Sequence, residues 1–152
     1  YLGIGIEESN HQYGHMGGNR RDARGIPLYE KSRGFVMTQI AKMVSRLESM
    51  PEGNGTMMDN TLIVYMSDAP DTHHSTAMEW PMLLVGDLGG RLKLGGQYIN
   101  YPGYGKSGHR TVGSFYSTLL HAAGASQETF GRLDPDLDEK TMQTGPCPEL
   151  LA

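Results

Sequence analysis

The stretch Asn60-Thr-Leu-Ile-Val-Tyr-Met-Ser-Asp68 decides the fold that we expect for this chain. Its centre, Thr61 to Met66, is dominated by β-branched, aromatic and large apolar residues, which is typical of a central strand covered on both faces. In an open α/β sheet the ligand crevice lies outside the carboxyl ends of the strands, so we expect a site directly after this strand. The polar residues at that point are Ser67, Asp68, Asp71, Thr72, His73 and His74.

Two amphipathic helices and further strands are predicted around this strand. Apolar residues at spacings of three and four predict one helix from about Tyr29 to Met50 and another over Arg110 to Ala123. Trp80 to Val85 indicates a second short buried strand. Residues 1–6 alternate apolar residues with Gly, which fits a strand, and residues 92–99 favour a hairpin or an edge strand.

The order strand, loop, helix, strand is that of a βαβ unit, for which a right-handed crossover and parallel pairing are the rule. We therefore expect an α/β fold with a mainly parallel sheet, flanking helices and long Gly-rich loops. Residues 1–125 form the expected α/β core, as part of a larger domain. Residues 126–152 carry few apolar residues and several prolines, so we expect an irregular tail that packs on the core, at its surface only.

Length and composition exclude several classes of protein. The 152 residues suffice for one domain, and a net charge of −4 without a basic block argues against nucleic acid as a partner. The longest apolar runs are too short to span a bilayer. The single Cys147 has no partner for an internal disulfide. The opening Tyr-Leu-Gly-Ile-Gly-Ile lacks an initiator Met, so we expect a processed product or a piece of a longer chain.

A carboxylate and an imidazole occur together after each of two predicted strands. Glu7 and His11 are four residues apart after the first strand, and Asp68 precedes His73 and His74 after the second. Mixed oxygen and nitrogen donors suit zinc, manganese or iron. Ordinary polar contacts within loops are the alternative interpretation of these residues. The predicted metal ligands are Asp68, His73, His74, Glu8, His11 and His15.

Other chemistries find less support in the sequence. Asp71, His73 and Ser75 include the residue types of a catalytic triad, but they share one short loop and no Gly-x-Ser-x-Gly elbow is present. The glycines between Gly86 and Gly96 lack the Lys followed by Ser or Thr of a phosphate-binding loop. We therefore predict no nucleotide cofactor and assign no catalytic residue.

Several motifs in sequence order resemble a known family. They are Gly55-Thr-Met-Met-Asp-Asn-Thr-Leu-Ile-Val-Tyr-Met-Ser-Asp68, then His73-His74, Trp80-Pro-Met-Leu-Leu-Val-Gly86 and the closing Gly145-Pro-Cys-Pro-Glu-Leu-Leu-Ala152. Together they resemble the C-terminal part of a large group of exported bacterial proteins called domain of unknown function 1552. A related exported group is similar to the alkaline phosphatase and sulfatase superfamily. The resemblance implies export and the C-terminal half of an alkaline phosphatase-like α/β fold.

The resemblance also implies a metal site with ligands after two strands. Glu8 or its neighbour Glu7, with His11 or His15, would match the first ligand pair of that superfamily, and Asp68 would match the second. Ala69 stands where the second ligand of that pair is usual, so His73, His74 or the distant His109 would have to replace it. The nucleophile of the superfamily comes from an N-terminal half that this sequence does not include.

Two functional hypotheses follow. The first is an exported, metal-dependent hydrolase of phosphate or sulfate esters, with zinc, manganese or calcium as the divalent metal. The alternative is a degenerate, non-catalytic scaffold or binding subunit of a larger assembly. In either case the expected partners are the N-terminal half of the fold or a larger complex.

Overall fold

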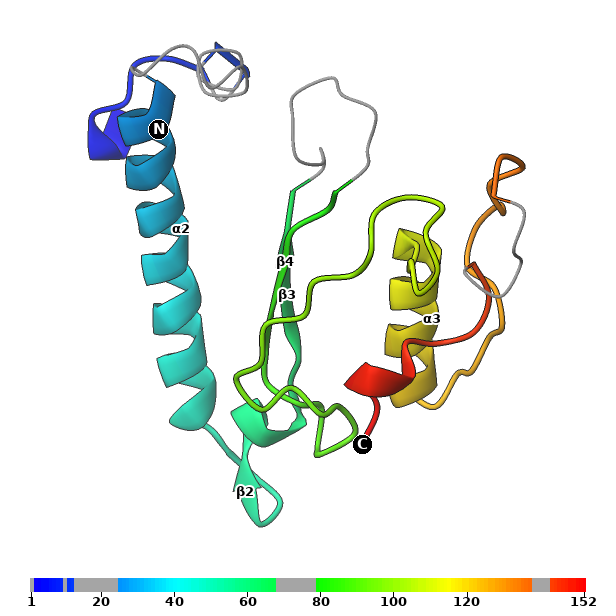
Figure 1. Ribbon diagram of the computed structural model, residues 1–152. Helices are drawn as coiled ribbons and strands as arrows, with labels where there is room; N and C mark the ends of the chain where they lie inside the picture. The colour runs from blue at the N-terminus through cyan, green and yellow to red at the C-terminus, as the bar shows by residue number, and fades with distance from the viewer. Residues whose placement is uncertain (1, 10, 13–24, 68–78, 138–142) are drawn as a thin grey trace. The chain divides into compact units, whose positions relative to one another are not determined.

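The structure is a computed structural model that describes residues 2–9, 11–12, 25–67, 79–137 and 143–152. It combines helices and short strands, which confirms the predicted α/β class in its coarse form (Figure 1). The chain divides into two compact units. The first unit consists of Tyr1–Met57 and Met66–Pro81, and the second consists of Met58–Tyr65 and Met82–Ala152.

The first unit is built on the long helix α2 (Gly25–Glu48), which confirms the predicted helix but begins four residues earlier. The short 3-10 helix η1 (Leu2–Ile4) contacts α2, and Lys31 Nζ donates to the Gly5 carbonyl oxygen at 3.4 Å. The prediction of a strand over residues 1–6 was therefore wrong. Glycines within a strand remove side chains that would pack, so the Gly alternation weakens a strand at this point.

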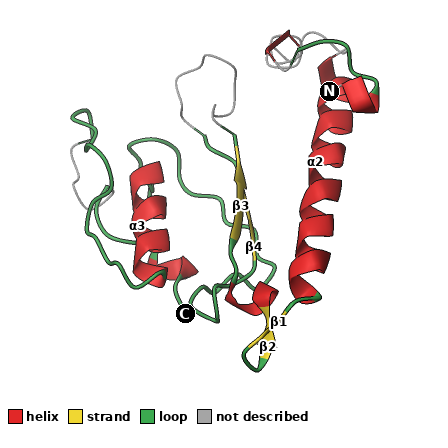
Figure 2. Ribbon diagram, turned by 180° about the vertical axis from the view of Figure 1, so that it is seen from behind, coloured by secondary structure: helices red, strands yellow, loops and turns green. Residues whose placement is uncertain are grey.

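Two pairs of strands occur in the described part of the chain (Figure 2). β1 (Pro51–Glu52) and β2 (Gly55–Thr56) form a small antiparallel hairpin with Pro51 opposite Thr56. The 3-10 helix η2 (Met57–Asn60) then leads toward β3 (Ile63–Met66), which pairs with β4 (Met82–Val85).

The pairing direction differs from the prediction. Both described sheets are antiparallel, and neither contains the expected parallel pair. The strand positions themselves were predicted correctly, because β3 lies within Thr61 to Met66 and β4 within Trp80 to Val85. The parallel arrangement required a strand before α2, and the residues there form η1 instead.

The core of the second unit lies between the β3–β4 sheet, the helix α3 (Val112–Ala122) and the C-terminal segment. Phe115, Cys147 and Leu150 are its buried centre. Val64, Met82 and Leu84 pack against this centre. Met82 and Leu84 alternate with Leu83, which is 41% exposed, so one face of the short sheet is covered within the unit.

The C-terminal segment is part of this core. Its 3-10 helix η4 (Pro148–Leu150) buries Leu150, and Leu151 forms an isolated antiparallel bridge with Leu92. The expectation that the tail packs only on the surface was therefore wrong for residues 143–152. The bridge is also the only β-structure of the expected hairpin over residues 92–99, since a turn at Gly95-Gly96 interrupts that stretch.

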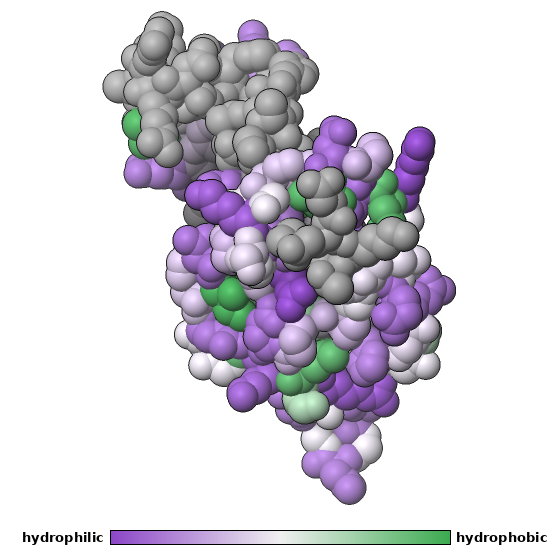
Figure 3. All heavy atoms as spheres, turned by 45° about the vertical axis from the view of Figure 1, so that its right-hand side comes forward, coloured by the Kyte–Doolittle hydropathy of each residue, from purple (hydrophilic) through white to green (hydrophobic). Residues whose placement is uncertain are grey.

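Polar residues predominate on one face of the molecule. On the face shown in Figure 3, hydrophobic residues form small separate patches among hydrophilic ones. This matches a chain in which hydrophobic residues make up only 38%. Among the residues that the structure describes, no helix combines the length and the apolar character needed to cross a membrane.

Candidate functional site

A hydrogen bond joins Ser67 and Trp80, two described residues on either side of the predicted metal-binding segment. β3 ends at Met66, and the carbonyl oxygen of the next residue, Ser67, accepts a hydrogen bond from Trp80 Nε1 at 2.8 Å. Trp80 lies two residues before β4 and is the only tryptophan of the chain. The predicted ligands Asp68, His73 and His74 follow Ser67 and lie outside the described residues.

The other predicted ligand group lies at the beginning of a helical turn. Ser9 N–H donates to Gln12 Oε1 at 2.8 Å, and Gln12 N–H donates to Ser9 Oγ at 3.2 Å. This reciprocal pair is a capping box, in which Ser and Gln three residues apart satisfy the first N–H groups of a helix. Glu8 is half-buried before the box, His11 is exposed in the first turn, and His15 lies outside the described residues.

The spacing of Ser9 and Gln12 matches the Ser-x-x-Gln pattern of a capping box, so this helix start has a signal in the sequence. Among residues 2–9, 11–12, 25–67, 79–137 and 143–152, no three His, Cys, Asp or Glu side chains gather in a way that could hold a metal ion. Four of the six predicted ligands fall outside these ranges, so the metal site stays a prediction.

His109 has a packing role in the second unit. Its side chain is only 9% exposed, and its Nδ1 lies 3.2 Å from the Pro102 carbonyl oxygen. The Tyr104 ring meets the imidazole edge-on, with ring centroids 5.7 Å apart. His109 therefore stabilises the connection that leads into α3 by packing, and its side chain is engaged within the second unit.

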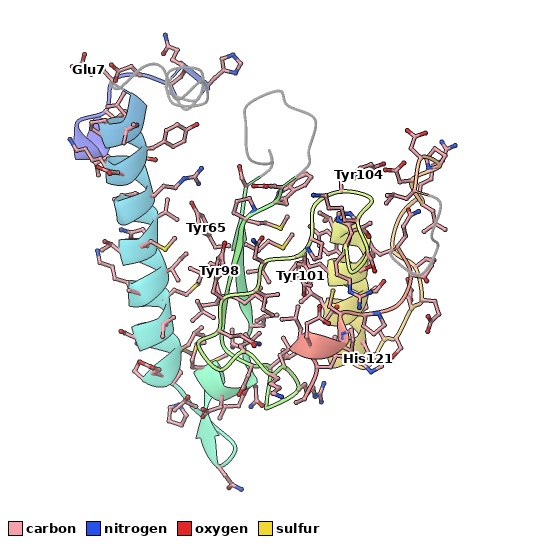
Figure 4. The ribbon with its side chains drawn as sticks, viewed as in Figure 1. Glu7, Tyr65, Tyr98, Tyr101, Tyr104 and His121 are labelled. Atoms are coloured by element: carbon pink, nitrogen blue, oxygen red, sulfur yellow. The ribbon has the colours of Figure 1, made fainter. Side chains whose placement is uncertain are left out.

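Tyr104 links this connection to the C-terminal part of the chain. Figure 4 shows Tyr101 and Tyr104 on the connection that leads into α3, and His121 at the end of that helix. The Tyr104 hydroxyl donates to Asp134 Oδ2 at 2.7 Å. This hydrogen bond raises the pKa of Tyr104 to about 12 and lowers the pKa of the Asp134 carboxyl.

A buried polar face of α3 receives the C-terminal segment. Ser114, Ser117 and Thr118 are fully buried, although the apolar spacing of this helix predicts only its apolar face as core. Small hydroxyl side chains let another stretch of backbone approach the helix closely. Thr118 Oγ1 donates to the Ser114 carbonyl oxygen at 2.8 Å and accepts from Cys147 N–H at 2.7 Å.

The Cys147 thiol is unsuited to nucleophilic chemistry. It is free and 1% exposed, and burial raises its pKa although the nearby hydroxyls of Thr118 and Tyr101 act in the opposite direction. Reactive cysteines need an accessible thiolate, which this environment disfavours. The Tyr101 hydroxyl lies close to this thiol and to Glu149, without a well-formed hydrogen bond to either within the described residues. Burial raises the pKa of Tyr101 well above its usual value.

Neither a protein-family model, nor a curated protein, nor a solved structure matches this chain. Function is therefore inferred from the chemistry of the chain's own residues and from how the described elements hold them.

Proposed function

We propose that the segment after β3 binds a divalent metal ion, with Asp68 as its first ligand and His73, His74, Glu8, His11 and His15 as the remaining candidates. The observation that carries the proposal is the position of Asp68. It follows Ser67, whose carbonyl is fixed by Trp80 at the end of a strand. Carboxylate and imidazole donors of this kind suit zinc or manganese, and carboxylates alone suit calcium.

The division of the chain supports this proposal. Two of the predicted ligands, Glu8 and His11, are described, and Ser67 and Trp80 are described residues on either side of the segment that carries Asp68, His73 and His74. All four described residues belong to the first compact unit. His109, the distant substitute considered from the sequence, belongs to the second unit and is engaged with Pro102.

We further propose that the activity is hydrolysis of a phosphate or sulfate ester in an exported protein with an alkaline phosphatase-like fold, as the family resemblance implies. A divalent metal bound to these donors would supply Lewis acidity toward an ester oxygen. Asp68 would hold its carboxylate at the strand end, and His73 or His74 would act as ligand or as proton donor. The remainder of the catalytic machinery would come from an N-terminal half or a larger complex.

A non-catalytic scaffold or binding subunit is the second candidate. Ala69 follows Asp68 directly, where the resembling superfamily carries a further ligand. The burial of His109 against Pro102 favours this candidate, because it removes one histidine that could have replaced the missing ligand.

Metal content and ester hydrolysis, measured together, test the two candidates. Protein prepared without chelators is analysed for zinc, manganese and calcium, and the same preparation is assayed with aryl phosphates and aryl sulfates. Bound metal and hydrolysis that both disappear in Asp68→Asn support the hydrolase. Bound metal without hydrolysis by a chain that includes the N-terminal half supports the scaffold. Absence of metal from the wild-type chain contradicts the proposed site.

A further inference from the structure

We propose that Lys31, Phe35, Lys42 and Arg46, the basic stripe of α2, dock on the surface of an anionic lipid bilayer. All four residues are described and exposed. At about 3.6 residues per turn, their spacing places them within about 60° of one another around the helix axis. The stripe therefore runs along one side of the helix. This surface is independent of the proposed metal site.

Positive charge is concentrated on the basic stripe. α2 carries four basic and two acidic residues, which gives it a net charge of +2, whereas the whole chain carries −4. Glu30 and Glu48 lie at least about 100° around the helix axis from every member of the stripe. The fourth cation, Arg33, lies on the opposite side of the helix, with its Cζ 5.8 Å from the centroid of the Tyr29 ring. The stripe thus combines three cations of α2 with none of its carboxylates.

The contacts of the described residues leave the stripe available to a partner. Lys31 Nζ donates to the Gly5 carbonyl oxygen at 3.4 Å, so this exposed ammonium group keeps two further donors. Lys42 and Arg46 form no ion pair with any residue that the structure describes. Phe35 is 39% exposed between these cations, on the side of an amphipathic helix where polar residues are usual. An aromatic ring and available cations therefore share one exposed surface.

An anionic bilayer fits this combination better than an acidic protein does. Acidic headgroups attract Lys and Arg side chains, and an aromatic ring enters the boundary between headgroups and acyl chains. A flat surface can contact the continuous helix along its length (Figure 1). A protein partner needs an apolar core within its interface, which a single Phe does not supply. Because the Debye length is about 8 Å at physiological ionic strength, the local charge of the stripe acts on the headgroups despite the net charge of −4.

Co-sedimentation of the full chain with lipid vesicles tests the charged members of the stripe. Vesicles of equal parts phosphatidylcholine and phosphatidylglycerol should bind the protein, whereas vesicles of phosphatidylcholine alone should not. Lys42→Gln combined with Arg46→Gln should weaken binding about 25-fold, since each cation contributes about fivefold. Lys106→Gln combined with Arg132→Gln is the matched control. It removes the same charge from exposed residues of the second unit and should bind like wild type.

Phe35→Ala tests the aromatic member. It should weaken vesicle binding about fivefold, because only the exposed part of the ring is free to enter the membrane. Tyr98→Ala, at a residue of the second unit that is 91% exposed, should leave binding unchanged. Urea midpoints of all variants verify that each is folded in the binding assay.

Three results would overturn the proposal: no binding to either kind of vesicle, equal binding to both kinds, or equal losses in the two double variants. Binding of poly-glutamate that depends on Lys42 and Arg46, without binding to vesicles, would overturn it in favour of an acidic protein partner.

Discussion

The backbone N–H of Cys147 donates a hydrogen bond to Thr118 Oγ1 at 2.7 Å, which ties the C-terminal segment to the middle of α3. The same hydroxyl donates to the Ser114 carbonyl oxygen, so it uses both its donor and an acceptor site. Thr118 and Cys147 are 0% and 1% exposed. A buried N–H that loses its acceptor costs about 1–3 kcal/mol, so this contact contributes to the stability of the second unit.

Thr118→Val should therefore destabilise the second unit by about 1–3 kcal/mol, because valine keeps the shape and leaves the Cys147 N–H without an acceptor. Thr118→Ser keeps the hydroxyl, so it should lose much less stability than Thr118→Val. The measurement is urea-dependent labelling of Cys147, which reports on this unit. Thr38→Val is a matched control, because Thr38 also donates to the carbonyl oxygen four residues earlier but is exposed. The free energy of unfolding of Thr38→Val should stay within about 0.5 kcal/mol of the wild-type value. Equal effects at both positions would contradict the role of the Cys147 contact.

Burial of Cys147 also predicts how stability depends on pH. The folded pKa of the thiol is raised, so above about pH 8.5 the unfolded chain releases a proton that the folded chain retains. The contribution of Cys147 to the free energy of unfolding should then be constant below about pH 8.5 and fall as pH rises, by at most about 1.4 kcal/mol per pH unit for one proton. The raised pKa of Tyr101 adds a second decline that begins near pH 10.

The variant Cys147→Ala separates these two contributions. Its urea midpoint should be lower than that of wild type at pH 7, because a buried side chain is shortened, but should stay level until about pH 10. Urea midpoints at intervals from pH 7 to pH 11 provide the comparison. If the urea midpoints of wild type and Cys147→Ala fell equally between pH 8.5 and pH 10, Cys147 would not be the cause of the decline.

Gly86 is a position where any side chain is excluded. Its φ is +88°, and a Cβ there would overlap the Thr61 carbonyl oxygen and the Met58 Cε. Gly124 has a similar φ of +82°, but a Cβ would meet nothing within 4 Å. Gly124→Ala should cost about 1–2 kcal/mol from the backbone conformation alone. Gly86→Ala should cost about 3 kcal/mol or more, since an overlap with backbone is added. Thermal unfolding of the two variants measures this difference, and similar costs would refute the predicted overlap.

The side chain of Gln143 holds the turn that begins at Asp134. Its Oε1 accepts from Asp134 N–H at 2.6 Å, and its Nε2 donates to the carbonyl oxygens of Asp134 and Leu137 at 3.0 and 3.2 Å. Gln143 is 4% exposed, so Gln143→Glu would place a buried carboxylate against two carbonyl oxygens. We expect a loss of about 2–4 kcal/mol at pH 7 in urea denaturation.

The loss at Gln143→Glu should diminish as pH falls toward about 4.3, the pKa of a solvated glutamate, because burial makes the folded carboxyl take up its proton above that pH and protonation restores one donor. Gln97→Glu is the control. Gln97 Nε2 also donates to a backbone carbonyl, that of Lys93 at 2.6 Å, but the side chain is exposed and should tolerate the change. A stability of Gln143→Glu that does not depend on pH would argue against a buried carboxylate at this position.

The positions of the helices and central strands were predictable, whereas strand pairing and the role of the C-terminal segment were not. The spacing of Val36, Ile40 and Leu47 predicted α2, and the apolar run after Thr61 predicted β3, because both signals are local. Periodicity carries no information on strand direction, so the antiparallel β3–β4 pair was missed. Cys147 and Leu150 lie among prolines without a period, and only the tertiary structure shows that they are buried.

The candidate site was predicted from residue types and strand ends, and the structure adds what surrounds it. The bond between Ser67 and Trp80 has no signal in the sequence, because it joins a backbone carbonyl to a side chain across a loop. The packing of His109 has no local signal either, because the Pro102 carbonyl oxygen that lies near its Nδ1 is brought there only by folding. Asp68, His73, His74 and His15 remain predicted ligands.

Direct titration of metal-free protein with Zn²⁺ and Mn²⁺ tests the central claim, that the segment after β3 is a metal site. Calorimetry of wild type should show saturable binding of at least one of the two ions. Asp68→Asn should weaken this binding at least about tenfold. Asp136→Asn, at an exposed aspartate of the second unit, should bind like wild type. Wild type that binds neither ion, or binding that Asp68→Asn leaves unchanged, would contradict the account.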